Sequence, residues 1–280
     1  MPCSCPALAV HRRRASSSSL IRAAALKAPI AASSRCRLPS DPPLSPDETR
    51  RYARHLVLKG FGGAAQQKLK AASALVVGAG GLGCPVVAYL AAAGIGRLGI
   101  IDPDTVSLSN LQRQILHTTA GVGTGKANNA KTFAEALNPH VTIEALATSI
   151  TEANAAQTLA SYDLVLDGTD NLFTRRLVAR TAAAQQKPLV SGAVSMFSGQ
   201  VTVFAPHLGG PGHEALFADE ADDTTLPSCE LNGILGPVTG VIGTLMAMEA
   251  IKLVTGTGTP LIGRVLVYDA RDAQFSELAY

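Results

Sequence analysis

Four glycines stand at a spacing that is typical of phosphate binding. Gly78, Gly80 and Gly83 form the pattern G-x-G-x-x-G, and Gly81 lies inside it. Between a strand and a helix, such a turn lets the backbone approach a phosphate closely, and the amino end of the helix favours the anion. Asp102 ends the next apolar segment, where a carboxylate can bind ribose hydroxyl groups. The pattern predicts a nucleotide site rather than a turn that serves only tight packing, and alone it would most often indicate NAD or FAD.

A cluster of charged and amide side chains after Asp102 argues against a redox cofactor. The candidates are Asp104, Asn110, Arg113, Gln114 and Lys126. Hydride transfer does not need such a cluster, because the nicotinamide carries the chemistry. Nucleotidyl transfer does need it, because negative charge must be stabilised at phosphorus. Arg113 or Lys126 alone would suggest a solvated surface charge, but their joint placement after the glycine-rich turn favours a phosphate site.

Two carboxylates follow another apolar segment, DLVLDGTDN, which covers residues 163–171. An acidic side chain near nucleotide phosphates suggests Mg²⁺, which usually takes one or two carboxylates together with phosphate oxygens. Asp170 is the candidate Mg²⁺ ligand, although it could instead cap the following helix. Asn171 is a further candidate for the nucleotide site, and Asp167 is expected to be structural.

These candidates are spaced by alternating short apolar segments and helical patterns. Predicted strands cover 74–77, 98–101, 141–146, 163–167 and 188–194, and predicted helices cover 84–93, 126–137, 151–160 and 172–185. Continuous apolar strands indicate a parallel sheet covered on both faces. After Pro188 the pattern changes, because residues 198–205 alternate polar and apolar side chains as in an antiparallel strand. A helix over about 239–254 and a strand over 264–270 follow.

The predicted fold class is α/β: a Rossmann-like doubly wound sheet with a parallel nucleotide-binding half and an antiparallel C-terminal half. The folded domain is predicted over residues 45–280, with its nucleotide-binding half at about 70–190 and its second half at about 191–280. Ser45 is a good helix cap, followed by proline and acidic residues, and this helix would continue through residue 58. Residues 206–232 lack periodicity and are predicted to be a functional or disordered loop.

Residues 1–44 have the composition of an organelle transit peptide. Seven of the 24 basic side chains lie in residues 1–40, which contain no acidic residue and include the run Ser16–Ser19. The plastid is favoured over the mitochondrion and the cytoplasm. A disordered tail and a wrongly assigned start codon are the alternatives. Because the rest of the chain is mildly acidic, no nucleic-acid surface is expected.

The body of the chain is expected to be soluble and to have no membrane span. No uninterrupted apolar run approaches the roughly 18 residues that a spanning helix needs. Cys84 and Cys229 are the only cysteines of the body, too few for a disulfide framework, which suits a reducing compartment.

Taken together, the motifs closely resemble those of the MoeB/ThiF-type adenylyltransferases, bacterial-style relatives of ubiquitin-activating enzymes. The resemblance covers about 50–275 and includes GAGGLG, DPDTVSLSNLQRQ, Lys126, DLVLDGTDN, SGQVTVF and the PSC segment at 227–229. It implies a nucleotidyltransferase that uses ATP to adenylate the C-terminal glycine carboxylate of a ubiquitin-like sulfur-carrier protein of the MoaD, ThiS or Urm type. Such carriers end in Gly-Gly, and the reaction releases pyrophosphate.

The resemblance also implies residue roles. The Gly78–Gly83 turn and Asp102 would bind ATP, Asn110, Arg113, Gln114 and Lys126 would contact its phosphates, and Asp170 would hold Mg²⁺. Arg54, in RYARH, would enter the active site of the other subunit of a homodimer. The second half of the domain, 191–280, would bind the carrier. Cys229 matches a loop cysteine that in some relatives bonds covalently to the carrier, although a small buried residue is the alternative.

Two departures from the family pattern are expected to matter. Relatives usually hold structural zinc through two C-x-x-C pairs, but residues 212–215 are Gly-His-Glu-Ala and no second pair follows the last strand. Zinc is therefore not expected, and the 206–232 loop should be mobile until a partner docks. Because no rhodanese domain follows, sulfur would come from a separate cysteine desulfurase or rhodanese. The alternatives are an adenylating relative with another substrate such as a tRNA base, an NAD(P)-binding oxidoreductase, and a binding module without catalysis.

Overall fold

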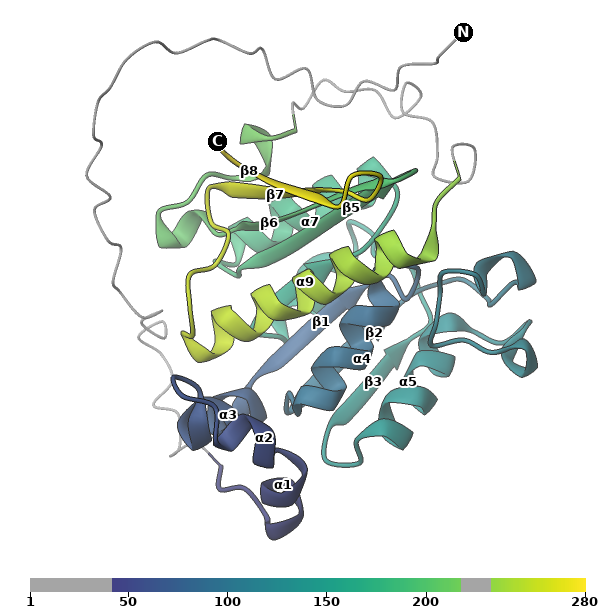
Figure 1. Ribbon diagram of the computed structural model, residues 1–280. Coiled ribbons are helices and arrows are strands. Elements are labelled where there is room, and N and C mark those ends of the chain that lie inside the picture. Colours follow the sequence, from purple (N-terminus) through teal and green to yellow (C-terminus); the bar gives the residue numbers. More distant parts are fainter. Residues whose placement is uncertain (1–41, 218–232) are drawn as a thin grey trace, which may run out of the picture.

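The computed structural model describes residues 42–217 and 233–280 (Figure 1). Nearly all of the predicted transit peptide lies outside the described residues. The same is true of Cys229 and of the second part of the predicted 206–232 loop.

An eight-stranded sheet crosses the molecule in the order β3-β2-β1-β4-β5-β6-β7-β8. The strands that pair in parallel are β1 (Ser73–Val77), β2 (Arg97–Ile101), β3 (Thr142–Leu146), β4 (Leu164–Asp167) and β5 (Leu189–Ser195). The antiparallel strands are β6 (Ser198–Phe204), β7 (Arg264–Asp269) and β8 (Gln274–Ala279). The predicted parallel half followed by an antiparallel half is therefore confirmed.

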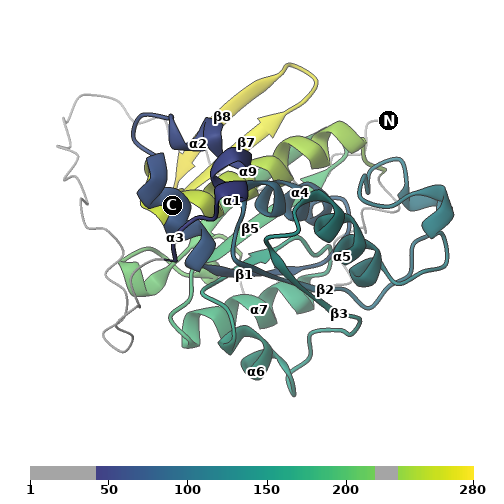
Figure 2. The ribbon, with the colours of Figure 1, turned by 90° about the horizontal axis from the view of Figure 1, so that it is seen from below.

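Helices cover both faces of the sheet, as Figure 2 shows from below. One face carries α4 (Gly83–Ala93), α5 (Lys126–Leu137) and α9 (Gly236–Thr255), and the other carries α6 (Ala155–Ala160) and α7 (Leu172–Ala184). Strand β1 divides its side chains between the two layers, because Ala74 and Val76 join the first core and Leu75 and Val77 join the second. Two buried cores of this kind explain why successive residues of the central strands are apolar, as in 74–77 and 164–166.

The amino-terminal helices differ from the prediction. The capping box at Ser45 and Glu48 is present, but the single predicted helix is broken at Tyr52 into α1 (Pro46–Arg51) and α2 (Ala53–Leu56). Tyr52 is buried, and its hydroxyl accepts a hydrogen bond of 2.8 Å from the Asn138 side chain. A third helix, α3 (Gly62–Ala71), leads into β1 and was not predicted. The break follows from a long-range contact that the local pattern does not encode.

Strand β8 was also missed, and α6 begins later than predicted. All six residues of β8 are exposed, and the strand lies at the sheet edge with β7 as its only neighbour in the strand order. An edge strand without a buried face leaves no apolar alternation in the sequence. Helix α6 begins at Ala155 rather than at residue 151, because the Asn154 side chain accepts the Thr151 N–H in a turn.

Helix α9 is long and apolar, but Glu249 and Lys252 interrupt it, so it is not an uninterrupted apolar run of membrane-spanning length. Its 20 residues and mean hydropathy of 1.5 over the most apolar stretch are enough, by length and composition alone, to cross a membrane. However, 56% of that stretch is buried inside the protein, and Ile242 and Met246 are completely inaccessible. The helix packs against α4, β5 and β6, so its apolar character is that of a core helix.

The first part of the predicted loop also differs from expectation. Residues 206–217 contain two short 3₁₀ helices, Pro206–Leu208 and His213–Ala215, rather than an unstructured segment. Leu216 and Phe217 pack against the core under α7. The expectation that the loop is mobile until a partner docks stays a prediction.

The turn between β1 and α4 generates a prediction about stability. A Cβ atom at Gly83 would lie 1.8 Å from the carbonyl oxygen of Gly78, so Gly83→Ala must displace backbone. We expect a loss of roughly 1–3 kcal/mol in the free energy of unfolding, the usual cost of overpacking. Gly240→Ala in α9 is the matched control, since nothing lies within 4 Å of its added Cβ and helix propensity should stabilise it by about 0.5–1 kcal/mol. Urea unfolding of both variants measures the difference, and equal stability would contradict the close approach.

Candidate active site

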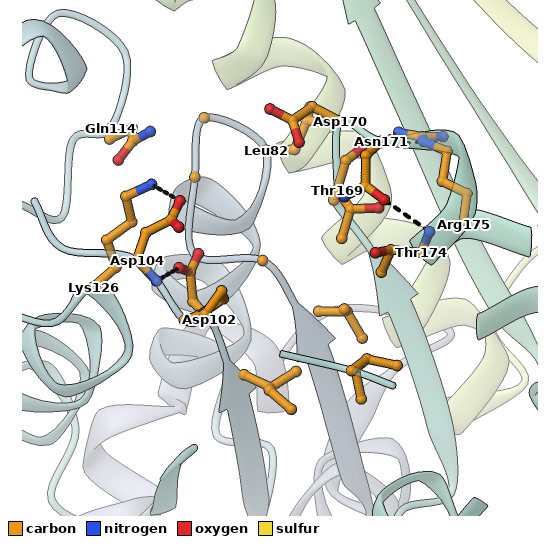
Figure 3. A pocket seen from close by; sticks show the side chains of 18 of the residues that line it. Leu82, Asp102, Asp104, Gln114, Lys126, Thr169, Asp170, Asn171, Thr174 and Arg175 are labelled. Atoms are coloured by element: carbon orange, nitrogen blue, oxygen red, sulfur yellow. Dashed lines mark hydrogen bonds and ion pairs between the residues drawn. The ribbon is translucent and has the colours of Figure 1, made fainter. Parts of the chain in front are cut away.

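A cleft of about 470 Å³ opens at the carboxyl ends of the parallel strands (Figure 3). Strands β2 and β4 flank β1 on opposite sides, so the chain winds away from β1 in two directions. Ligands of open α/β sheets bind at such a switch point. The cleft is lined by the turns after β1 to β4 and by the end of β5. Further lining residues are Asn110, Arg113, Gln114, Lys126, Phe217, Ile234 and Thr239.

The amino ends of four helices also line the cleft. The lining includes Leu82 at the start of α4, Lys126 of α5, Leu172 of α7 and Thr239 in the first turn of α9. Helices α4, α5 and α9 begin without a side-chain cap from the described residues, whereas Asn171 caps α7. A helix amino end carries a partial positive charge and free N–H groups. The fold therefore favours an anionic ligand even before side-chain charges are counted.

The glycine-rich turn takes the conformation that its composition predicts. Gly78 has a φ of 93°, and Gly78, Gly80 and Gly81 all line the cleft. Gly83 does not line it, but allows α4 to start directly against the turn. A Cβ at Gly81 would lie 3.0 Å from the side chain of Thr239. Small residues are thus needed both for ligand access and for packing against α9.

Asp102 is buried and holds the turn in place. Its carboxylate accepts N–H groups from Ala79, at 2.7 Å, and from Asp104, at 2.9 Å. Burial raises the pKa of the Asp102 carboxyl group, whereas the two backbone hydrogen bonds and the charge of Lys126 act to lower it. The side chain therefore fixes the glycine-rich turn in addition to facing the cleft, a role that was not predicted.

The predicted cations reach the same cleft. The Lys126 ammonium pairs with Asp104 at 2.8 Å, and 9% of the Lys126 side chain is exposed against 63% for Asp104. Arg113 is half-buried and donates to the carbonyl oxygen of Ser109 at 3.2 Å. Both cations line the cleft, as do Asn110 and Gln114. The grouping of side chains inferred from spacing is thus present in space.

Gln114 has a buried acceptor without a partner. Its Oε1 atom makes no hydrogen bond within the described part of the chain, and the side chain is 3% exposed. The Nε2 atom lies 3.7 Å from where Gly80 would carry a Cβ. An unpaired buried polar group costs about 1–3 kcal/mol, so a bound ligand with a donor at this place would be favoured.

On the other side of the cleft, Figure 3 shows Thr169, Asp170, Asn171 and Arg175. Asp170 is exposed and makes no hydrogen bond or ion pair to another described residue. Asn171, not Asp170, caps α7 by accepting the Thr174 N–H at 2.8 Å. This leaves the Asp170 carboxylate available to a ligand.

Asp167 is 1% exposed and accepts hydrogen bonds from the backbone N–H and the hydroxyl of Thr169. It also lies 3.8 Å from Arg175. These contacts hold the turn that follows β4. Asp167 therefore has the structural role that was expected of it.

Sequence reasoning missed Arg175. This arginine is 8% exposed, and its Nε donates to the carbonyl oxygen of Thr169 at 3.1 Å while Nη2 donates to that of Gly192 at 2.5 Å. It therefore ties the turn after β4 to β5. The available signal was a basic residue in the first turn of a helix, where the helix dipole disfavours a cation unless it has other partners.

Arg54 is not among the residues that line this cleft. Arg54 is exposed on α2, which packs on α3 at the amino end of β1, so it lies at the opposite edge of the sheet from the cleft (Figure 1). Cys229 lies outside the described residues. Within one chain, the cleft is therefore assembled without Arg54.

Comparison with known proteins agrees with this geometry. Residues 52–280 match the ThiF family. The chain is 45% identical over 235 residues to "Adenylyltransferase and sulfurtransferase MOCS3" of Aedes aegypti, which covers 84% of this chain and 54% of the relative. It is 47% identical over 236 residues to "Sulfur carrier protein adenylyltransferase" of Thermus thermophilus, with 83% and 87% covered. The chain thus spans about half the length of the first relative and most of the second.

Solved structures share the fold at lower identity. The crystal structure of PaaA superposes with a TM-score of 0.73 at 22% identity, covering 84% of this chain and 74% of PaaA. Escherichia coli MccB superposes with a TM-score of 0.72 at 20% identity, covering 82% of this chain and 70% of MccB. The resemblance inferred from the motifs is confirmed, and the chain belongs to the ThiF family.

Proposed function

We propose that this protein uses ATP to adenylate the C-terminal glycine carboxylate of a ubiquitin-like sulfur-carrier protein. The observation that carries the proposal is the convergence of the glycine-rich turn, Arg113 and Lys126 on a cleft already lined by four helix amino ends. The names of the Aedes and Thermus relatives both include adenylyltransferase, and that of the Thermus relative specifies a sulfur carrier protein.

ATP would lie along the cleft from Asp102 to the amino end of α7. The Gly78–Gly81 backbone suits the phosphates, because it offers close approach and the uncapped start of α4. Asp102 would face the ribose, and Lys126 and Arg113 would neutralise the phosphates together with the amides of Asn110 and Gln114. The buried Oε1 atom of Gln114, which has no partner among the described residues, favours a ligand that brings a hydrogen-bond donor.

The reaction forms one bond to phosphorus and breaks another. A carboxylate oxygen of the carrier attacks the α-phosphorus, and the bond from that phosphorus to the bridging oxygen breaks, so pyrophosphate leaves with the electron pair. Negative charge builds up on the α-phosphate oxygens and on the leaving group. Lys126 and Arg113 are placed to stabilise it, and such preorganised charge is often the largest catalytic term. The product is a mixed anhydride that a sulfur nucleophile can attack.

The same site suits Mg²⁺, with Asp170 as its protein ligand. The Asp170 carboxylate is exposed at the cleft and has no partner among the described residues. Mg²⁺ commonly takes few carboxylates and completes its shell with phosphate oxygens and water. When bound, the ion would neutralise phosphate charge, while Asp170 and the capped start of α7 would fix its place.

The carrier would reach the cleft along a neighbouring groove. This groove, of about 810 Å³, follows β5–β8 and is lined by apolar side chains such as Val265, Val267 and Leu278. It shares Ala193, Val194 and Phe217 with the nucleotide cleft, so the two hollows adjoin at these residues. A flexible C-terminal tail could therefore extend from a carrier seated on the antiparallel strands to the α-phosphate. Sulfur would come from a separate donor, a cysteine desulfurase or a rhodanese, and a covalent role for Cys229 stays a proposal.

Pyrophosphate–ATP exchange tests this function. The purified protein should exchange labelled pyrophosphate into ATP only when a ubiquitin-like carrier ending in Gly-Gly is added, and MoaD-, ThiS- and Urm-type carriers should be compared. Lys126→Ala and Arg113→Ala should each reduce exchange by ~10²–10³-fold, since each removes a preorganised charge.

Lys131→Ala is the matched control for Lys126, because Lys131 lies on the same helix and pairs only with Glu135 on the surface. This control should exchange at the wild-type rate. Tight NAD(H) binding without ATP binding would refute the assignment, and wild-type exchange by both active-site variants would show that the phosphate site is elsewhere.

A homodimer with Arg54 acting in the partner's site is proposed as well. Arg54 is exposed, and the apolar side chains of Val57 and Leu58 beside it are 77% and 57% exposed, which suits a subunit interface. Mixing Arg54→Ala and Lys126→Ala proteins should then restore part of the exchange activity, because a mixed dimer has one site with both residues. Exchange of subunits is checked with two affinity tags. Full subunit exchange without any recovered activity would contradict an arginine shared between subunits.

We further propose that the domain folds without zinc. His213 lies where the family resemblance places the first cysteine pair, and its ring packs among aromatic side chains instead. Among residues 42–217 and 233–280, no cluster of three or more His, Cys, Asp or Glu side chains is suited to a metal. Elemental analysis should find no stoichiometric zinc, and EDTA should leave the melting temperature unchanged. A measured content of about one zinc per chain would overturn this proposal. Structural zinc can contribute ~10–16 kcal/mol to folding, so its removal by EDTA would then lower the melting temperature.

A further inference from the structure

Phe217 lies where the nucleotide cleft and the apolar groove meet. It lines both hollows, and the other residues common to both are Ala193 and Val194 at the end of β5. A peptide that runs from the groove into the cleft must therefore pass between the Phe217 ring and this part of β5. The side chains on the β5 side are small or branched, so the ring is the bulkiest group at the passage.

The ring of Phe217 is held in place by a row of rings. It stacks on His213 with a centroid separation of 4.7 Å and an interplanar angle of 27°. His213 packs on Phe204 at 5.3 Å, and Phe204 meets Tyr280 edge-on at 6.2 Å. Phe204 is 3% exposed, and the Tyr280 hydroxyl lies 2.8 Å from that of Thr202. The row anchors Phe217 to the core of the antiparallel half.

His213 takes part in this row as a neutral ring. Its Nε2 atom is buried and has no hydrogen-bond partner among the described residues. Burial is the main cause that lowers the pKa of His213, with the charges of Arg175 and Arg176 acting in the same direction and those of Asp167 and Glu214 opposing them. The backbone N–H of Phe217 donates to the carbonyl oxygen of His213 at 3.0 Å, which fixes the offset between the two rings.

We propose that Phe217, positioned by His213, determines specificity by admitting only a C-terminal tail that lacks side chains near its end. An extended residue with a Cβ would direct it toward one wall of the passage, either the Phe217 ring or the Ala193 and Val194 side, whereas glycine has no side chain to accommodate. The penultimate residue of the carrier is the position read in this way. This inference rests on the proposed adenylation of a ubiquitin-like carrier and adds the residue that selects its tail.

The test is a cycle of enzyme and carrier variants. The carrier that best supports exchange by the wild-type protein is used with glycine, alanine or valine at its penultimate position. Wild-type protein should prefer glycine over alanine by about tenfold or more in kcat/KM, and the preference over valine should be larger. A difference of one or a few methyl groups typically changes kcat/KM by this much in a tight pocket. In Phe217→Ala this preference should fall about tenfold. The ratio of the two preferences isolates the contact between the ring and the tail.

Four further variants separate this role from a structural one. His213→Phe keeps a ring in the row and should keep the preference, whereas His213→Ala should weaken it. Phe275→Ala removes an aromatic ring from β8 that is 53% exposed and lines neither hollow, and it should change nothing. Phe217→Leu replaces Phe217→Ala in the test if the alanine variant does not fold, and it should lower the preference for a penultimate glycine in part.

Two results are distinct. If wild-type protein exchanges pyrophosphate with a Gly-Gly carrier but Phe217→Ala and Phe217→Leu keep the full preference for glycine, the role of Phe217 is refuted and the proposed function stands. If wild-type protein shows no exchange with any Gly-Gly carrier, the proposed function itself is refuted, before any variant is compared.

Discussion

The active cleft depends on one close approach, between the end of β1 and the start of α4. The turn has no room for a side chain at Gly83, because its Cβ would meet the Gly78 carbonyl. The turn after β4 lies close by, since a Cβ at Gly168 would be 3.2 Å from Leu82. Gly78 has a positive φ, which side chains disfavour. With this turn in place, the start of α4 faces the cleft. Asp102 then holds the turn from β2 by accepting the Ala79 N–H.

Charge in the cleft is arranged around an anion that the protein does not itself supply. Arg113, Lys126 and Arg175 face Asp102, Asp104 and Asp170, so the formal side-chain charges balance. The helix amino ends add positive potential that no carboxylate fully offsets. Lys126 is buried and Asp104 is mostly exposed, so the Asp104 carboxylate can yield its place to a phosphate at little cost. The ion pair thus keeps Lys126 oriented until a stronger anion arrives.

The antiparallel half places its apolar groove beside the nucleotide cleft. Strand β5 belongs to both halves, since it pairs in parallel with β4 and antiparallel with β6. Arg175 links this strand to the turn after β4 by its bond to the Gly192 carbonyl. A groove along β5–β8 and a cleft above β1–β4 therefore share a wall. Movement of that wall would couple the two sites directly.

Much of the site was predictable because its signals are local. The glycine-rich turn, the start of α5 at Lys126 and the carboxylates after β2 and β4 each follow from a few adjacent residues, and parallel strands bring such turns to one edge. The change from continuous to alternating hydrophobicity after Pro188 likewise marked the change of sheet type. These features depend on backbone conformation and burial, which short patterns encode.

The tertiary structure alone decided which distant segments complete the site. Thr239 lies against Gly81 although strands β2 to β6 separate them in the chain, and Phe217 reaches the cleft from a segment without periodicity. Tyr52 breaks the first helix because its hydroxyl meets Asn138, and β8 pairs at an edge without a buried face. Contacts of this kind are selected by shape and by burial against partners far away in sequence. They leave no local periodicity, so only the folded packing reveals them.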